Sequence, residues 1–465
     1  MAKPSSSNRS GDAAAGRGQP AWSPEGLAGP LFADAAMEAR FSLEAFVRRM
    51  VNVEVALATV EADAGVVPPQ AAQTIAARAA SFEVDYQRLI LGTRADGVPA
   101  IELVRQLREH VGPEAADAVH FGATSQDVMD TALVLVIGEA LADLEDVLRS
   151  VMANLADLAR QHRGTWMAGR THAQQAVPIP FGLKVAGWLA PLLRHVRRLG
   201  EIKPRLLVVQ LGGAAGTLAP LGGRGLAIEQ ALAQALGLGV APMPWHTQRD
   251  TLAEIAGWLS LVDGALAKMA GDIILLAQSE VGEVRESGPT GGGSSTMPQK
   301  HNPIVSEQIV AIARSSAGLV SAMHQALIQE HERGTHGWQI EWITLPRMFS
   351  LTAAAVRKAE FLTAHLSVDG DRMRRNLAAS QGLTLAEAIT YALASTLGRS
   401  EAADVVRAAS RIAEAENRHL VDVVRERSQA PLDWERLKDE TASAGSAQGF
   451  IDRVLEALSH QSDPI

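Results

Sequence analysis

The chain has 465 residues, a net charge of −9 and no cysteine. Without cysteine it can form no disulfide, thiolate nucleophile or cysteine-ligated metal site. The negative charge, with no dense basic patch, argues against nucleic acid as the main partner, and no apolar run is long enough to span a membrane. Because 47% of the residues are hydrophobic and only 4% are aromatic, we expect a core of close-packed helices.

The N-terminal part divides into a tail and a helical region. Residues 1–20 are rich in Ser, Gly and Ala and lack the apolar core of a signal peptide, which predicts a disordered tail on a cytoplasmic protein. Residues 21–116 form the first predicted helical domain. There Ser42 is a candidate N-cap, and the sequence Val67-Pro68-Pro69 is expected to end the helix that Ser42 begins.

Apolar residues recur at spacings of four and three through residues 117–366, the predicted central domain. Such spacing is typical of helices that pack as in coiled coils. The longest stripe, 125–163, predicts a helix of roughly 55–60 Å at about 1.5 Å per residue. Similar stripes fall in 185–199, 255–276, 304–327 and 345–366. Their width predicts a helix bundle that continues into an oligomer, and a monomeric bundle is the alternative.

The last part of the chain, residues 367–465, is more charged and has shorter helical patterns, which indicates a third, C-terminal helical domain. No alternating strand pattern stands out, so the predicted fold class is all-α. Leu206–Gly216 could pass for a strand and a phosphate loop, but it lacks the Gly-x-Gly-x-x-Gly spacing and the Walker lysine. We therefore expect a bend between helices there.

The segment Gly288–Pro303 interrupts the helical pattern with three consecutive glycines and three prolines. It is expected to be a long mobile loop between rigid elements, the usual place for catalytic groups. Removing a proton beside a carboxylate requires a base and several donors for the charge that develops. Ser294 or Ser295 could supply the base, and Lys300 and Asn302 the donors. A glycine-serine linker, the alternative, does not explain the polar run after the glycines.

The segment Gly169–Pro178 contains one side chain suited to proton transfer near neutral pH, the imidazole of His172. Thr171 and Gln174 on either side of it can hydrogen-bond a carboxylate. The alternative is a structural histidine. Because these polar residues flank His172, a functional role for its imidazole is favoured.

The segment His120–Asp127 precedes the longest predicted helix. Thr124 and Ser125 stand at the expected helix start, where free N–H groups and the helix dipole favour an anion. This arrangement could hold a substrate carboxylate. The alternative is a simple N-cap.

Two arginines could bind a further carboxylate. Arg249 ends the run Trp245–Arg249 at a predicted helix start, and Arg333 ends the run Gln329–Arg333. Either guanidinium could form a bidentate ion pair with a substrate carboxylate or could join helices. No His-Glu-x-x-His or other ligand spacing is present, so no metal site is expected.

Together these segments resemble the fumarase/aspartase superfamily. Gly293–Pro303 is similar to its signature loop, in which the first serine of the pair, here Ser294, is the catalytic base. Gly169–His172 resembles the segment whose histidine assists the leaving group or activates water. Thr124 and Ser125 resemble the segment that binds carboxylate. The substrate-binding residues predicted in this way are Thr124, Ser125, Thr171, Gln174, Gln248, Arg249, Ser295, Met297, Asn302 and Arg333.

The resemblance implies an all-α fold of three domains with a central bundle of long helices. Four copies would form a twenty-helix core, and each active site of this homotetramer would take segments from three subunits. The motifs therefore need not meet within one chain. The substrate would be a small dicarboxylate, and no cofactor would be required.

Within the superfamily, the chain most resembles the branch of 3-carboxy-cis,cis-muconate cycloisomerases and adenylosuccinate lyase-like enzymes. The segments Pro244–Asp250, Gln329–Arg333 and Met373–Leu377 are similar to that branch. Bacterial cycloisomerases, however, carry a residue other than histidine, often Trp, where His172 stands. They also read His-Lys-Arg-Asn-Pro at Gln299–Pro303. The β-eliminating members use a histidine at the first of these positions.

We therefore predict a lyase that catalyses β-elimination from a succinate-type substrate, an N-substituted aspartate or a nitrosuccinate, to give fumarate or a substituted fumarate. Ser294 would take the proton beside a carboxylate, and Lys300 and Asn302 would hold the aci-carboxylate. His172 would protonate or orient the leaving group. The first alternative is a 3-carboxy-cis,cis-muconate cycloisomerase, in which the leaving group is an intramolecular carboxylate. The second is a non-catalytic helical scaffold.

Overall fold

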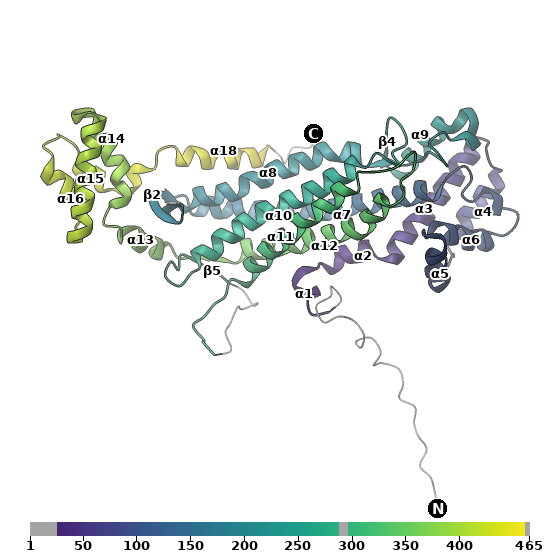
Figure 1. The fold of residues 1–465 in the computed structure, drawn as a ribbon, viewed down its shortest axis with the longest axis horizontal. Helices are drawn as coiled ribbons and strands as arrows, with labels where there is room; N and C mark the ends of the chain where they lie inside the picture. Colours follow the sequence, from purple (N-terminus) through teal and green to yellow (C-terminus); the bar gives the residue numbers. More distant parts are fainter. Residues whose placement is uncertain (1–25, 288–295, 461–465) are drawn as a thin grey trace, which may run out of the picture.

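Five long helices form the centre of the molecule, with a smaller helical region at each end (Figure 1). The structure, a computed structural model, describes residues 26–287 and 296–460. The long helices are α7 (Ser125–Gln161), α8 (Phe181–Leu206), α10 (Asp250–Leu276), α11 (Ile304–Gln325) and α12 (Gly337–Ala364). Each contains one of the five apolar stripes, so the all-α fold class is confirmed.

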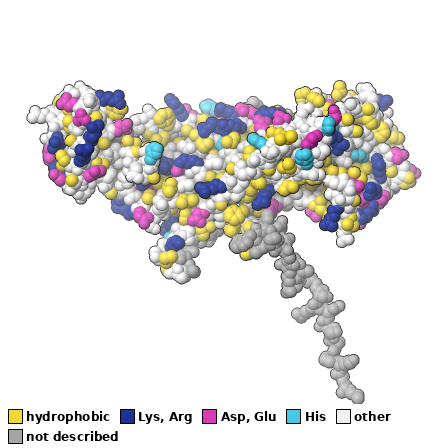
Figure 2. Space-filling view, in the orientation of Figure 1, with side chains coloured by type: hydrophobic (Ala, Val, Ile, Leu, Met, Phe, Trp, Pro, Cys, Tyr) yellow, Lys and Arg dark blue, Asp and Glu magenta, His cyan; other side chains and the backbone are white. Residues whose placement is uncertain are grey.

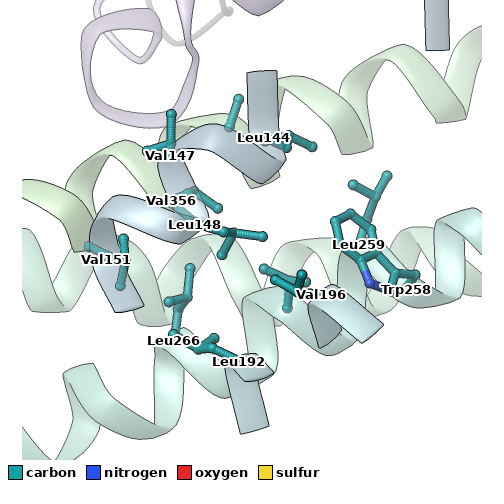
Figure 3. Close-up of a cluster of buried hydrophobic side chains, with 14 of the residues drawn as sticks. Leu144, Val147, Leu148, Val151, Leu192, Val196, Trp258, Leu259, Leu266 and Val356 are labelled. Carbon is teal, nitrogen blue, oxygen red and sulfur yellow. The ribbon is translucent and has the colours of Figure 1, made fainter. Parts of the chain in front are cut away.

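The stripes face one another in a single core that runs along the bundle. Figure 3 shows Leu148 and Val151 of α7 near Leu192 of α8 and Leu266 of α10, with Leu144 further along α7. All five side chains are almost completely buried. Burying one such side chain contributes about 1.5–3 kcal/mol. Packing of the stripes, more than helix propensity, therefore explains why helices of this length persist.

Helices α1 (Gly29–Phe32) and α2 (Ala35–Arg40) pack along the bundle, α1 against α11 and α12 and α2 against α12 and α7. The region next to the start of α7 consists of α3 (Leu43–Asp63), α4 (Pro69–Ala79), α5 (Tyr86–Asp96), α6 (Ala100–Val111), η1 (Ala116–Ala118), β3 (Val208–Val209), η2 (Ala219–Arg224), α9 (Gly225–Leu236) and β4 (Gly239–Val240). Ser42 caps α3 as predicted, since its Oγ accepts a hydrogen bond from the Ala45 N–H at 3.2 Å.

The predicted end of α3 was wrong. The helix stops at Asp63, and Gly65 follows it with φ +68°, a left-handed conformation that ends helices readily. The prolines instead begin the next helix, with Pro69 as the first residue of α4. A proline fits that position because the first N–H of a helix has no partner within the helix.

The opposite end of the bundle carries the C-terminal helices. These are α13 (Gly370–Ala378), η3 (Leu383–Leu385), α14 (Ala386–Leu397), α15 (Arg399–Glu416), α16 (Leu420–Arg427), α17 (Trp434–Lys438), η4 (Glu440–Ser443) and α18 (Ala447–Ser459). Residues 385–430 pack around a core of their own. Helix α18 returns along α8 (Figure 1). The division of the chain into domains at 21–116, 117–366 and 367–465 stays a prediction.

Three short two-stranded sheets were missed at the sequence level. Strands β1 (Trp166–Thr171) and β2 (Gln174–Pro180) form an antiparallel hairpin, β3 and β4 pair in parallel, and β5 (Val284–Glu286) pairs antiparallel with β6 (Leu366–Val368). Strands of two to seven residues leave almost no alternation to detect. The bend expected in Leu206–Gly216 is present, and it contains β3.

Charged side chains of both signs and hydrophobic side chains are interspersed on the face shown in Figure 2. Several large hydrophobic residues of the bundle are exposed in the single chain, among them Leu261 and Leu275 on α10 and Ile343 on α12, which is 77% exposed. Within 26–287 and 296–460, no helix is long and apolar enough to cross a membrane.

Candidate active site

One cluster of predicted site residues forms at the start of α7. Thr124 and Asp127 make a capping box, in which the Thr124 N–H donates to the Asp127 carboxylate at 3.0 Å. Arg333, in the connection between α11 and α12, donates to Thr124 Oγ1 at 2.7 Å and to Gln126 Oε1 at 3.3 Å. Both acceptors are neutral. No carboxylate of the described chain forms a salt bridge with Arg333, so its positive charge is available to an anionic ligand.

Asp127 also links the start of α7 to a glycine-containing bend, a role that the sequence analysis did not predict. Its buried carboxylate accepts hydrogen bonds from the N–H groups of Gly212 and Gly213 at 3.0 and 2.9 Å. It also contacts His246 Nε2 at 2.6 Å. The glycine N–H groups that a phosphate would need are therefore occupied by Asp127, which agrees with the expectation that Leu206–Gly216 is a bend.

Arg249 lies in the interior, which corrects its assignment as a substrate-binding residue. Its guanidinium donates to both oxygens of Asp130 at 2.7 and 3.0 Å and to both oxygens of Glu341 at 2.8 and 2.5 Å. All three side chains are at most 2% exposed. Burial alone would lower the pKa of Arg249, but the two carboxylates outweigh it and raise the pKa. With its donors directed at α7 and α12, Arg249 joins helices. Its neighbour Gln248 is exposed.

A second unpredicted group, His120, lies four residues before Thr124. Its Nδ1 is 2.6 Å from Oε1 of the buried Glu54 of α3, and its φ is +62°. Burial works to lower the pKa of His120, but Glu54 raises it by more. Deeper in the same region, burial and the charge of Glu54 raise the pKa of Glu61 to about 8. A buried acidic residue without a nearby arginine is not recognisable from sequence spacing.

His172 occupies the tip of the β1–β2 hairpin. His172 and Ala173 form a two-residue turn with φ values of +48° and +61°, the conformation of a type I′ turn. Glycine or asparagine usually fills such positions, and other residues held there in left-handed conformations are concentrated at functional sites. Thr171, His172 and Gln174 are exposed. Their side chains make no hydrogen bond or ion pair with any residue that the structure describes.

The third group lies before α11. Lys300 is exposed and Asn302 is partly buried, and both line a hollow of about 1030 Å³ together with Glu307. Glu286, at the end of β5, accepts hydrogen bonds from the N–H groups of Val305 and Ser306 at 3.1 and 2.8 Å and so fixes the start of α11. Met297 is exposed. Ser294 and Ser295, the predicted base and its neighbour, lie outside the described residues.

The structure brings Thr124, Ser125 and Arg333 together. Gln248 and Arg249 lie in the same region, since the neighbouring His246 contacts Asp127 and Arg249 pairs with Asp130 of α7, but His172, Lys300 and Asn302 lie elsewhere. The β1–β2 hairpin follows the far end of α7, which has 37 residues and is about 55 Å long. Lys300 and Asn302 precede α11, whereas Arg333 follows it, and 22 residues of helix correspond to about 33 Å. The candidate groups are therefore divided between the two ends of the bundle (Figure 1).

This architecture, an all-α bundle with polar candidate groups at both ends, is that of the helical lyases to which comparison with known proteins assigns the chain. A family model described as a lyase matches residues 32–318, and the chain belongs to the fumarase/aspartase superfamily. It is 44% identical to a 3-carboxy-cis,cis-muconate cycloisomerase of Pseudomonas aeruginosa over 91% of this chain and 94% of that protein. It is 36% identical to a nitrosuccinate lyase of Streptomyces davaonensis over 94% and 96%.

A solved structure agrees with this assignment. The 3-carboxy-cis,cis-muconate lactonizing enzyme from Pseudomonas putida matches with a TM-score of 0.88 and 40% identity, covering 94% of this chain and 100% of that one. The protein is thus an enzyme of the lyase superfamily. The cycloisomerase similarity favours the first alternative of the sequence analysis over the predicted C–N lyase.

Proposed function

We propose that the protein is a cycloisomerase of the 3-carboxy-cis,cis-muconate type, which interconverts an unsaturated polycarboxylate and its lactone. The observation that carries the choice of a cycloisomerase is the 44% identity to such an enzyme over 91% of this chain. A carboxylate substrate is supported by the cradle at the start of α7, where Arg333 binds Thr124 and has no acidic partner among residues 26–287 and 296–460. An unneutralised guanidinium at a helix start suits a carboxylate ligand. The similarity to cycloisomerases over nearly the whole chain supports this substrate class.

The chemistry uses one proton and one carbon–oxygen bond. In the lactone-opening direction, Ser294 removes the proton from the carbon beside a carboxylate, and Lys300 and Asn302 stabilise the charge that moves onto that carboxylate. The electron pair then forms the carbon–carbon double bond, and the lactone oxygen leaves as a carboxylate. In the lactonising direction the same steps run in reverse. Losing one donor at such a developing oxyanion typically costs about 10²–10³ in rate.

A second candidate is the β-elimination of an N-substituted aspartate or of nitrosuccinate. The observation that favours it is His172, an imidazole presented at an exposed turn where it could protonate a leaving group. The similarity to a nitrosuccinate lyase is consistent with this chemistry. The two candidates share the base and the carboxylate cradle and differ only in the leaving group.

We further propose a homotetramer with shared active sites. The exposed hydrophobic residues of α10 and α12 support an interface between copies. The separation of about 55 Å along α7 also supports this assembly, because one chain alone cannot bring Thr124 and His172 to the same substrate.

The test is a substrate panel with matched variants. The protein would be assayed for lactone formation from 3-carboxy-cis,cis-muconate, and for fumarate release from aspartate, N-substituted aspartates, nitrosuccinate and malate. We expect lactone formation that Ser294→Ala abolishes and Ser295→Ala retains in larger part. His172→Trp should be tolerated by a cycloisomerase and should cripple an eliminase. Serine-dependent fumarate without lactone would replace the first candidate by the second.

A further inference from the structure

The hairpin that carries His172 is anchored immediately below its tip. Arg170 of β1 donates two parallel hydrogen bonds to Glu283, at 2.8 and 2.7 Å. Glu283 is completely buried, whereas Arg170 is one-fifth exposed. Asn376 of α13 donates to the same carboxylate at 2.9 Å and to the Val281 carbonyl at 2.8 Å. We call Arg170, Glu283 and Asn376 the hairpin clamp.

The clamp coincides with an irregularity in the hairpin. Ala168 pairs with Pro178 but Arg170 pairs with Gln175, so Gly169 alone opposes two residues of β2. Such bulges bend a strand and re-aim its side chains. A side chain at position 169 would approach the Val177 carbonyl to 2.9 Å, so the close approach requires glycine. The bulge therefore lies directly beside the residue that meets Glu283.

Beyond the clamp, the tip is exposed, and Gln175 donates to the Asn376 carbonyl at 3.5 Å. Residues 171–175 are all exposed. The two turn residues occupy left-handed conformations that other surroundings would not maintain. Glu283 itself is rigidly placed, because its N–H donates to the Leu276 carbonyl at the end of α10 and its carbonyl accepts from the Asp369 N–H. The clamp thus ties the exposed tip to the end of the bundle.

We propose that Glu283, acting through Arg170 and Asn376, is the positioning residue that sets the direction of the His172 imidazole. The kinetic part of the inference rests on the second candidate of the proposed function, the β-elimination, in which His172 acts on the leaving group. It gives a role to Asn376 in Met373–Leu377, a segment that the proposed function leaves unused. A bidentate arginine–carboxylate pair fixes both distance and plane, which a single ion contact would not do. Glu283 touches no substrate and acts only through the hairpin.

The kinetic test compares Glu283→Gln in two backgrounds. In the otherwise unaltered protein we expect kcat to fall about 10–100-fold with KM within about twofold, since a misdirected general acid loses most of its effect. In a His172→Ala background the same substitution should cost nothing more. An equal loss in both backgrounds would overturn the proposal, because Glu283 would then act on something other than His172.

Arg163→Met is the matched control. Arg163 lies just before the same hairpin and pairs with Asp452 of α18 at 2.7 Å, but it does not contact the strands near the tip. Its loss should leave kcat unchanged. If Glu283→Gln does not fold, Arg170→Lys replaces it. Lysine keeps the positive charge but cannot form the two parallel hydrogen bonds that arginine makes. A kcat reduction of equal size in Arg163→Met would contradict the clamp.

A second measurement needs no activity. The chain has no cysteine, so Ala173→Cys provides a unique site for a spin label at the tip. We expect the electron paramagnetic resonance spectrum of the label to narrow in Glu283→Gln and Arg170→Lys but not in Arg163→Met. An unchanged spectrum would refute the clamp even in an active enzyme. A protein inactive on every substrate but with the expected spectra would refute the proposed function and retain the clamp.

Discussion

The two ends of the central bundle hold their functional groups in opposite ways. At the start of α7, Arg333 and Thr124 stand on a buried network in which Arg249 binds two carboxylates and Asp127 binds two glycine N–H groups. At the other end, His172 projects from an exposed two-residue turn, and one ion pair beneath it provides the anchor.

Under the proposed function, this difference would separate substrate binding from proton transfer. A carboxylate cradle is most effective when its donors are fixed before the substrate arrives, because no reorganisation is then needed. A group that must enter a site made by other copies has to protrude from its own chain. The rigid end therefore suits recognition of the substrate, and the protruding end suits completion of a neighbouring site.

The comparison predicts complementation between two inactive variants, the largest effect expected. Arg333→Met damages the carboxylate-binding end. In the β-elimination of the second candidate, His172→Ala damages the protruding end at a cost of about 10²–10⁴ in rate. When the two proteins are unfolded together and refolded, mixed tetramers should regain activity, because some sites take both native segments. Steady-state assays of the mixture measure the gain. Mixed tetramers that form without regaining activity would show that the two ends do not share a site.

Removing the central cation of the rigid end should destabilise the fold strongly. In Arg249→Met, Asp130 and Glu341 remain buried without their partner, which should cost about 3–5 kcal/mol of unfolding free energy. Urea denaturation measures the loss. The control is Arg205→Met, which breaks the exposed pair with Glu254 and should cost at most about 1 kcal/mol. Equal losses in the two variants would mean that the buried network does not stabilise this end.

Glu61 should make the rigid end sensitive to alkaline pH. Its pKa is raised to about 8 in the folded protein by burial and by Glu54, so folding retains a proton that the unfolded chain loses above its ordinary carboxyl pKa. Stability is therefore highest below that ordinary pKa and falls as pH rises towards 8. Glu61→Gln should flatten this slope and add about 2 kcal/mol at pH 9. Denaturation midpoints between pH 5 and 9 test it, and an unchanged slope would contradict it.

The smallest effect concerns the start of α11, near Lys300. Glu286→Gln removes the negative charge from the helix start and leaves one acceptor oxygen for the Val305 and Ser306 N–H groups, which now bind separate oxygens. The expected loss is about 1 kcal/mol, measurable as a small fall in the thermal midpoint. The loss should shrink at high salt, and a salt-independent loss would indicate a packing defect instead.

The sequence predicted the long helices well because their apolar spacing is local and repeated. It also placed Ser42 correctly, since an N-cap is a contact between residues three apart. It could not decide between the two roles of Arg249, because Asp130 and Glu341 lie 119 and 92 residues away along the chain. The sequence analysis missed the strands because they are too short to show an alternating pattern.

The candidate site was predictable as a set of segments but not as a geometry. Thr124, His172 and Lys300 were recognised by their motifs, yet only the structure shows that Arg333 reaches Thr124 and that Glu283 anchors the hairpin. Glu283 and Arg170 are 113 residues apart. Such pairs have no signature in one sequence, because the fold alone brings them together.

The glycine bend over Asp127 is an anion-binding nest that the chain fills from within. Consecutive backbone N–H groups of this kind commonly bind phosphate, and here they hold a side chain of the neighbouring helix instead. Asp127 is in effect an internal ligand, permanently bound at an effective concentration that no free anion can match. Phosphate and nucleotides in the surrounding solution should therefore leave this region unaffected, and the cradle beside it stays open to carboxylates.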